Sequence, residues 1–133
     1  MAGIVNLSKL IQNMDPQLNE GEYVFVSVQS LDEIPLNNIV GTIREKEGIT
    51  VIIERQSADQ LKLTYEFIAA WITLNVHSDL TAIGLTAAFS TALANNGISC
   101  NVVAGFYHDH IFVDHKDKDQ AIKTLQDLKT AVA

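Results

Sequence analysis

Three consecutive polar side chains, His77-Ser78-Asp79, are the best candidates for a ligand site in this chain of 133 residues. They offer an imidazole, a hydroxyl and a carboxylate, and a helix is predicted to begin soon after them, near Gly84. The Asp79 carboxylate would accept hydrogen bonds from an ammonium group, and backbone N–H groups at the helix start would donate to a carboxylate. Gly84 would let the backbone approach a ligand closely. The same residues also suit a structural role, in which Ser78 or Asp79 organises the turn before the helix.

A second group of polar residues, His108-Asp109-His110, has a spacing that could bind a metal ion. On a strand, residues two apart face the same side, so both imidazoles could reach one Zn²⁺ or Ni²⁺ ion. Such a site needs further ligands, and Asp109 would point to the opposite face. The sequence contains no HExxH helix and no cysteine pair. We therefore expect no metal and no cofactor, and a small metal-dependent enzyme that uses His108 and His110 is a less favoured alternative.

Cys100 is the only cysteine, and it could in principle act as a nucleophile beside a histidine. Its apolar surroundings, residues 98–104, favour a packing role instead. The sequence has no Gly-x-Ser-x-Gly elbow, no phosphate-binding loop and no Gly-x-Gly-x-x-Gly. No catalytic residue is predicted.

The net charge of −7, from 16 acidic and 9 basic residues, makes nucleic acid and anionic membrane surfaces poor partners. The longest fully apolar run, residues 67–72, is far shorter than a membrane span. The first ten residues do not resemble a signal peptide. We expect a cytoplasmic protein.

Hydrophobic spacing predicts the elements of the first half as a helix over 7–14, strands over 23–28, 39–44 and 49–54, and a short helix over 57–63. A polar loop, residues 31–38, separates the first two strands. The second and third strands form a hairpin, in whose turn Gly48 is expected to adopt a backbone conformation that other residues avoid.

The second half is predicted to form a strand over 67–77, a helix that begins near Gly84 and ends at Gly97, strands over 98–104 and 110–114, and a helix over 117–132. On the first of these strands, Ile72 and Leu74 should face one way and Trp71 and Thr73 the other, with Trp71 in the core. This order is a ferredoxin-like βαββαβ unit without its last strand. We expect an α+β fold of two halves, residues 1–66 and 67–133, that share or pair antiparallel sheets.

The block from Trp71 to Leu128 resembles ACT domains, the small ligand-sensing modules of amino-acid metabolism. The likeness rests on the helix start GLTAAF (84–89), the turn NGIS (96–99) and the final helix. The whole chain resembles a bacterial family of tandem ACT-like domain proteins, through segments such as GEYVFVSV (21–28), REKEGITVI (44–52) and GISCNVVAGFYHDHIFV (97–113). The first half departs from the ACT pattern, because no helix is evident between residues 28 and 39.

The resemblance implies an ACT-like regulatory or sensing protein without catalysis, which forms a homodimer and binds a small molecule, possibly an amino acid. In ACT domains the ligand binds where the loop after the first strand meets a neighbouring domain. Carried onto this chain, the ligand-binding residues would be His77, Ser78, Asp79, Ile83, Gly84, Leu85 and Thr86. Asn101, on the next strand, would join them if it faces a neighbouring domain, and is otherwise a surface amide. The alternative function is a module for dimerisation or partner docking that needs no ligand.

Overall fold

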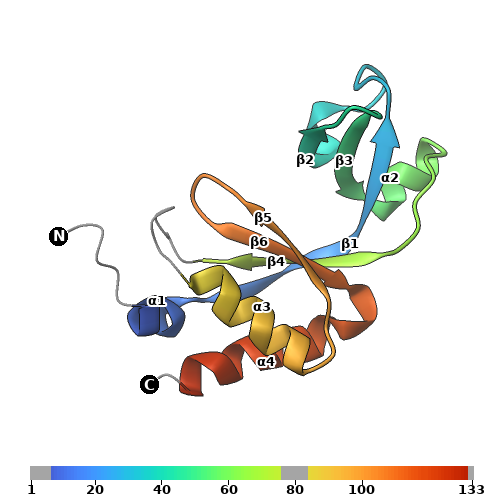
Figure 1. Ribbon diagram of the computed structural model, residues 1–133. Helices are drawn as coiled ribbons and strands as arrows, with labels where there is room; N and C mark the ends of the chain where they lie inside the picture. Colours follow the sequence, from blue (N-terminus) through green and yellow to red (C-terminus); the bar gives the residue numbers. More distant parts are fainter. Residues whose placement is uncertain (1–6, 76–83, 132–133) are drawn as a thin grey trace. The chain divides into compact units, whose positions relative to one another are not determined.

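The computed structural model describes residues 7–75 and 84–131. The chain divides into two compact units, which we name by size (Figure 1). The small unit is residues 20–70, and the large unit combines residues 1–19 with 71–133. Two strands, β1 (Pro16–Val28) and β4 (Ala69–Leu74), each have residues in both units. The division into halves at residue 66 stays a prediction.

The small unit is built on three strands in the order β2-β3-β1. β2 (Ile39–Arg44) and β3 (Ile49–Glu54) form the predicted antiparallel hairpin, and β3 also pairs antiparallel with β1. A short 3-10 turn, η1 (Leu36–Asn38), and one helix, α2 (Arg55–Gln60), are its other elements. α2 begins two residues before the predicted start, and Ser57 lies inside it.

Gly48 does not have the unusual backbone conformation that was expected for it. Among the described glycines only Gly21, Gly84 and Gly97 have a positive φ. A Cβ atom on Gly48 would instead lie 2.9 Å from Oγ of Ser27 and 3.0 Å from the carbonyl oxygen of Val28. Glycine is needed at this turn because the end of β1 passes too close for a side chain.

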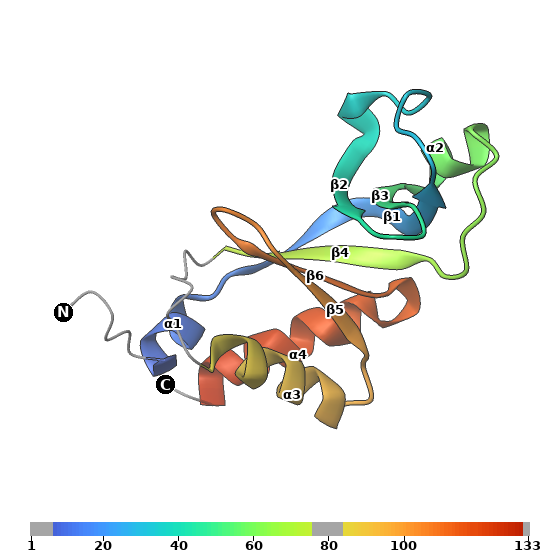
Figure 2. The same ribbon diagram turned by 45° about the horizontal axis from the view of Figure 1, so that its top comes forward.

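The large unit has four strands in the order β1-β4-β6-β5, with helices lying along one side of the sheet (Figures 1 and 2). Its further strands are β5 (Cys100–Ala104) and β6 (Asp109–Asp114), an antiparallel pair. Its helices are α1 (Leu7–Asn13), α3 (Leu85–Asn95) and α4 (Lys118–Ala131), with a 3-10 turn, η2 (His115–Asp117), before α4. The predicted order of helices and strands along the chain is confirmed.

The two faces of β4 differ as its alternation predicts. Ile72 and Leu74 are fully buried, whereas Trp71 and Thr73 are only partly buried. The expectation that Trp71 belongs to the core is therefore wrong. Its indole ring stacks on Phe112, with the centroids 6.2 Å apart, and its N–H group is used in a polar contact. A tryptophan at the boundary of a core can pack its ring and satisfy its N–H at the same time.

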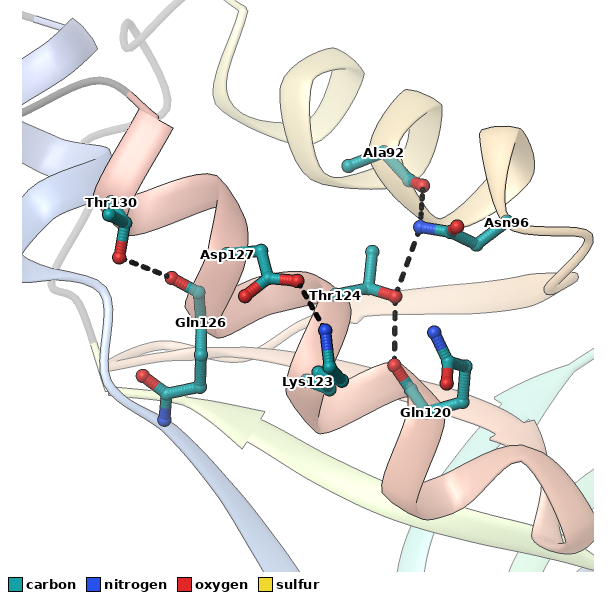
Figure 3. Close-up of polar contacts among 8 residues, drawn as sticks. All are labelled: Ala92, Asn96, Gln120, Lys123, Thr124, Gln126, Asp127 and Thr130. Carbon is teal, nitrogen blue, oxygen red and sulfur yellow. Dashed lines mark hydrogen bonds and ion pairs between the residues drawn. The ribbon is translucent and has the colours of Figure 1, made fainter.

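α3 and α4 are tied together by a hydrogen bond between their side chains (Figure 3). Nδ2 of Asn96, at the end of α3, donates to Oγ1 of Thr124 across 3.2 Å, and Oγ1 of Thr124 donates to the carbonyl oxygen of Gln120 at 2.8 Å. Thr124 is the one buried polar residue recorded for the described part of the chain, with 4% of its surface exposed. Its hydroxyl is thus satisfied on both sides, as a buried polar group requires.

β1 is much longer than predicted, because it begins at Pro16 rather than at Tyr23. Its first residues, PQLNEGE, are mostly polar and give no strand signal. Backbone and side-chain hydrogen bonds to β4 and its end hold them: the N–H of Asn75 donates to the carbonyl of Asp15, and Nδ2 of Asn19 donates to the carbonyl of Trp71.

Candidate functional site

The start of α3 is the described part of the predicted ligand site. Gly84 is the N-terminal cap residue, with φ of 97°, and its carbonyl oxygen accepts the first helical hydrogen bond, from the N–H of Ala88 at 2.8 Å. Gly84 itself has no side chain that could cap this end of the helix. The N–H groups of the first turn, from Leu85 to Ala87, precede that first helical donor and therefore point out of the helix end. They can donate to an anionic group.

Gly84 is also held against α1. A Cβ atom at this position would lie 3.1 Å from Cδ2 of Leu7. Leu85 is buried, and the Thr86 side chain is exposed, while the Thr86 carbonyl accepts a hydrogen bond from Oγ of Ser90. Four predicted ligand residues, His77, Ser78, Asp79 and Ile83, lie outside the described residues.

Asn101 is not brought together with the start of α3. It is exposed on β5, a strand that follows the other end of α3, and a helix of this length spans roughly 16 Å. It pairs with Phe112 on β6, so both side chains lie on the sheet face that carries Trp71. The helices cover the other face. A ligand contact by Asn101 therefore stays a prediction, and it would belong to a different surface from that of Gly84.

The sheet face that carries Trp71 holds a network of polar side chains from three strands. Nε1 of Trp71 donates to Nδ1 of His110 at 3.0 Å, and Oγ1 of Thr73 lies 3.2 Å from the same nitrogen. Nδ2 of Asn19 donates to Oγ1 of Thr73 at 2.9 Å. Because an indole can only donate, Nδ1 of His110 must be the acceptor, which places the proton of the neutral ring on Nε2. The Thr73 hydroxyl, which accepts from Asn19, can donate to the same Nδ1.

Burial lowers the pKa of His110 from the ordinary value of 6.5, and the neighbouring His108 lowers it further, against an opposing effect of Asp109. The hydrogen bond from Trp71 also favours the neutral imidazole of His110, because a proton on Nδ1 would remove the acceptor that the Trp71 N–H needs. Sequence inspection singled out His110, but its two partners on β4, Trp71 and Thr73, are distant along the chain.

His108 lies in the turn before β6 rather than on the strand, so the spacing argument that could have placed His108 and His110 on one strand face does not apply. Its Nδ1 atom is buried and has no hydrogen-bond partner within the described ranges. Residues 7–75 and 84–131 contain no group of three His, Cys, Asp or Glu side chains arranged to hold a metal ion. Cys100 is partly buried on β5, and this burial raises the pKa of its thiol, which disfavours the reactive thiolate.

The small unit contains a cavity of about 450 Å³ that sequence inspection missed. It lies between the end of β1 with the loop that follows and the turn after α2. Its lining is formed by Ser27, Val28, Gln29, Ser30, Asp32, Glu33, Ile34, Leu61 and Leu63. The available signal was the polar loop at residues 31–38, which takes the place of a helix between two apolar strands.

Comparisons with known proteins were made for the whole chain. A family model described as an ACT domain matches residues 2–70, and a second model with the same description matches residues 66–127. None of the curated proteins gives a significant match.

Among solved structures, a protein of unknown function from Vibrio cholerae, described as a possible transport protein, is 44% identical over 96% of this chain and 98% of its own, with a TM-score of 0.84. A protein from Agrobacterium tumefaciens is 16% identical over 87% and 89% of the two chains, with a TM-score of 0.70. The regulatory subunit of aspartate kinase from Thermus thermophilus is 7% identical over 85% and 95%, with a TM-score of 0.59. The last two share the fold alone.

No helix in the described part of the chain is long and apolar enough to span a membrane.

Proposed function

This chain belongs to the ACT-domain family, with two ACT domains in tandem, and we propose that it is a regulatory protein that binds a small metabolite, an amino acid by preference, and has no catalysis of its own. The tandem family match carries this proposal, because ACT domains are regulatory modules. The similarity to the regulatory subunit of aspartate kinase is in fold and adds no ligand of its own. Each half, residues 1–66 and 67–133, would correspond to one ACT domain.

The ligand would bind at the start of α3. The carboxylate of an amino acid would accept hydrogen bonds from the N–H groups of Leu85, Thr86 and Ala87, and Asp79 would accept from its ammonium group. The positive φ of Gly84 and its close approach to Leu7 support this proposal, because they hold the helix end at a cap residue that has no side chain of its own to compete with a ligand. His77, Ser78 and Ile83 would complete the site.

Thermal unfolding and calorimetric titration of the full chain with each of the twenty amino acids test the proposal. A ligand present at a hundred times its dissociation constant stabilises the folded state by about 2.7 kcal/mol. For a chain of this size that corresponds to a rise in Tm of roughly 5–15 °C. Asp79→Asn should weaken binding of the active amino acid roughly tenfold or more. The matched control is Asp119→Asn, which removes an exposed carboxylate on α4.

If no amino acid raises the Tm, the proposed ligand is refuted. If Asp79→Asn and Asp119→Asn bind the active amino acid equally well, the proposed site is refuted.

The second candidate function is a dimerisation or docking module that is indifferent to ligands. The exposed side chains at the β5–β6 turn favour it: Phe106 is 86% exposed and Tyr107 is 66% exposed, and their rings meet edge to face. β5 is also the last strand of its sheet. Sedimentation that shows a stable dimer, unchanged by any amino acid and lost in Phe106→Ser, would favour this function.

A further inference from the structure

The cavity of the small unit is a second and separate place where this chain can hold a ligand. It lies entirely within residues 20–70, so its walls belong to one compact unit. Its volume of about 450 Å³ falls within the range of 300–1,000 Å³ in which small-molecule sites of proteins lie.

The cavity exists because residues 29–38 contain only the short turn η1, so α2 alone among the described helices covers this sheet. The core beneath consists of Val24, Val26, Ile34, Val51, Ile53 and Ala58. Leu61 and Leu63 extend this apolar surface into the cavity from the turn after α2.

The turn after α2 has a defined geometry that places both leucines. The N–H of Leu63 donates to the carbonyl of Ala58, and the N–H of Lys62 donates to that of Asp59. This is the Schellman pattern of a helix end, and Lys62 takes the left-handed conformation that it requires, with φ of 57°. Leu61 and Leu63, on either side of Lys62, therefore both reach the cavity.

The charged residues that line the cavity are both acidic. Asp32 and Glu33 bring two carboxylates, and none of the described lining residues is Lys, Arg or His. Neither carboxylate has an ion-pair or hydrogen-bond partner for its side chain in the ranges 7–75 and 84–131. The N–H of Asp32 donates to Oγ of Ser30, and Nε2 of Gln29 donates to the carbonyl of Glu47, so the loop that carries the carboxylates is held in place.

We propose that this cavity binds a small organic cation, a primary ammonium group attached to a short apolar chain. The ammonium group would lie at Asp32 and Glu33, and the apolar chain would lie against Val28, Ile34, Leu61 and Leu63. The carboxylate of a ligand would meet the negative charges of Asp32 and Glu33 with no basic lining residue beside them, so free acids are repelled. The cavity thereby differs from the start of α3, whose N–H groups select anions, and its ligand is not a zwitterionic amino acid.

Titration of the ¹⁵N-labelled full chain with 3-methylbutylammonium, followed by NMR, tests this proposal. Saturable amide shifts are expected in residues 27–34 and 61–63. The isosteric anion 3-methylbutanoate should produce no saturable shift there. Methylammonium should bind at least about tenfold more weakly, because it lacks most of the apolar chain. The affinity should also fall as salt is raised, because both carboxylates are exposed.

The double variant Asp32→Asn, Glu33→Gln should weaken binding of 3-methylbutylammonium roughly threefold or more. Both side chains are exposed, so the variant is expected to fold. Glu66→Gln, which removes an exposed carboxylate of the same unit away from the cavity, should leave the affinity within about twofold. Equal binding of amine and acid, shifts confined to residues 84–87, or no saturable shift with the amine would each overturn the proposal. Amino-acid binding at the start of α3 is tested separately, by the titrations with the twenty amino acids.

Discussion

Trp71 on β4 donates the hydrogen of its indole nitrogen to Nδ1 of His110 on β6, across 3.0 Å. The bond requires a neutral imidazole, and burial lowers the pKa of His110 from its ordinary value of 6.5. The folded state therefore binds a proton at His110 less readily than the unfolded state does. Between the lowered pKa and 6.5, the unfolded chain carries more protons, so stability rises with pH in this window.

We expect the free energy of unfolding to fall as the pH is lowered from above 6.5 through the folded pKa of His110. Urea unfolding at a series of pH values measures this. The emission of Trp71, the only tryptophan, should change with a midpoint below 6.5. His110→Gln keeps an acceptor for the indole but cannot titrate, so it should remove the emission change. A midpoint above 6.5 in the unaltered chain would contradict the assignment.

The contact between α3 and α4 leads to a second expectation. Thr124→Val keeps the shape of the side chain but removes the hydroxyl that joins Asn96 to Gln120. Because this hydroxyl is buried, we expect a loss of about 1–2 kcal/mol in the free energy of unfolding. Thr130→Val is the matched control, since Thr130 makes the same type of bond to the carbonyl of Gln126 but is exposed (Figure 3). It should change stability by less than about 0.5 kcal/mol; equal losses would show that the contact between helices contributes nothing.

The left-handed conformation of Lys62 gives a stabilising substitution. A residue with a side chain is strained at φ of 57°, whereas glycine adopts this conformation freely. Lys62→Gly should therefore raise the free energy of unfolding by about 0.5–1 kcal/mol, as measured by urea titration. Lys46→Gly, in the β2–β3 turn and without a positive φ, should bring no gain. A loss of stability in Lys62→Gly would mean that its side chain contributes more than the strain costs.

Substitutions of Gly84 and Gly97, at the two ends of α3, distinguish the effect of backbone strain from the effect of crowding. Both have positive φ, but a Cβ atom at Gly84 would lie 3.1 Å from Leu7, whereas none of the described atoms lies within 4 Å of one at Gly97. Alanine at either position should destabilise the fold, by about 1–3 kcal/mol, with the larger loss at Gly84. Introducing Leu7→Ala beside Gly84→Ala should make the two losses non-additive in thermal unfolding. Strict additivity would rule out the contact.

Local patterns of residues were sufficient for much of the fold. The hairpin of β2 and β3 has the predicted bounds, and α3 ends at Asn95, just before the left-handed Gly97, as the glycine indicated. Alternation along β4 correctly separated Ile72 and Leu74 from Trp71 and Thr73. Such features depend on side-chain periodicity and on the conformational freedom of single residues, which neighbours in the sequence already express.

Long-range contacts decided the rest. The mostly polar start of β1 is a strand because β4 supplies hydrogen-bond partners for it, and Trp71 lies at the edge of the core, where His110 accepts its N–H. The cavity beside Asp32 exists because a loop, and not a covering helix, follows β1, and because Leu63 lies at the cavity after α2. The order of helices and strands, most of their bounds and the family likeness could therefore be predicted from local patterns in the sequence. Which polar groups meet, and where a cavity remains, could not be predicted in this way, because both depend on packing between residues far apart in the chain.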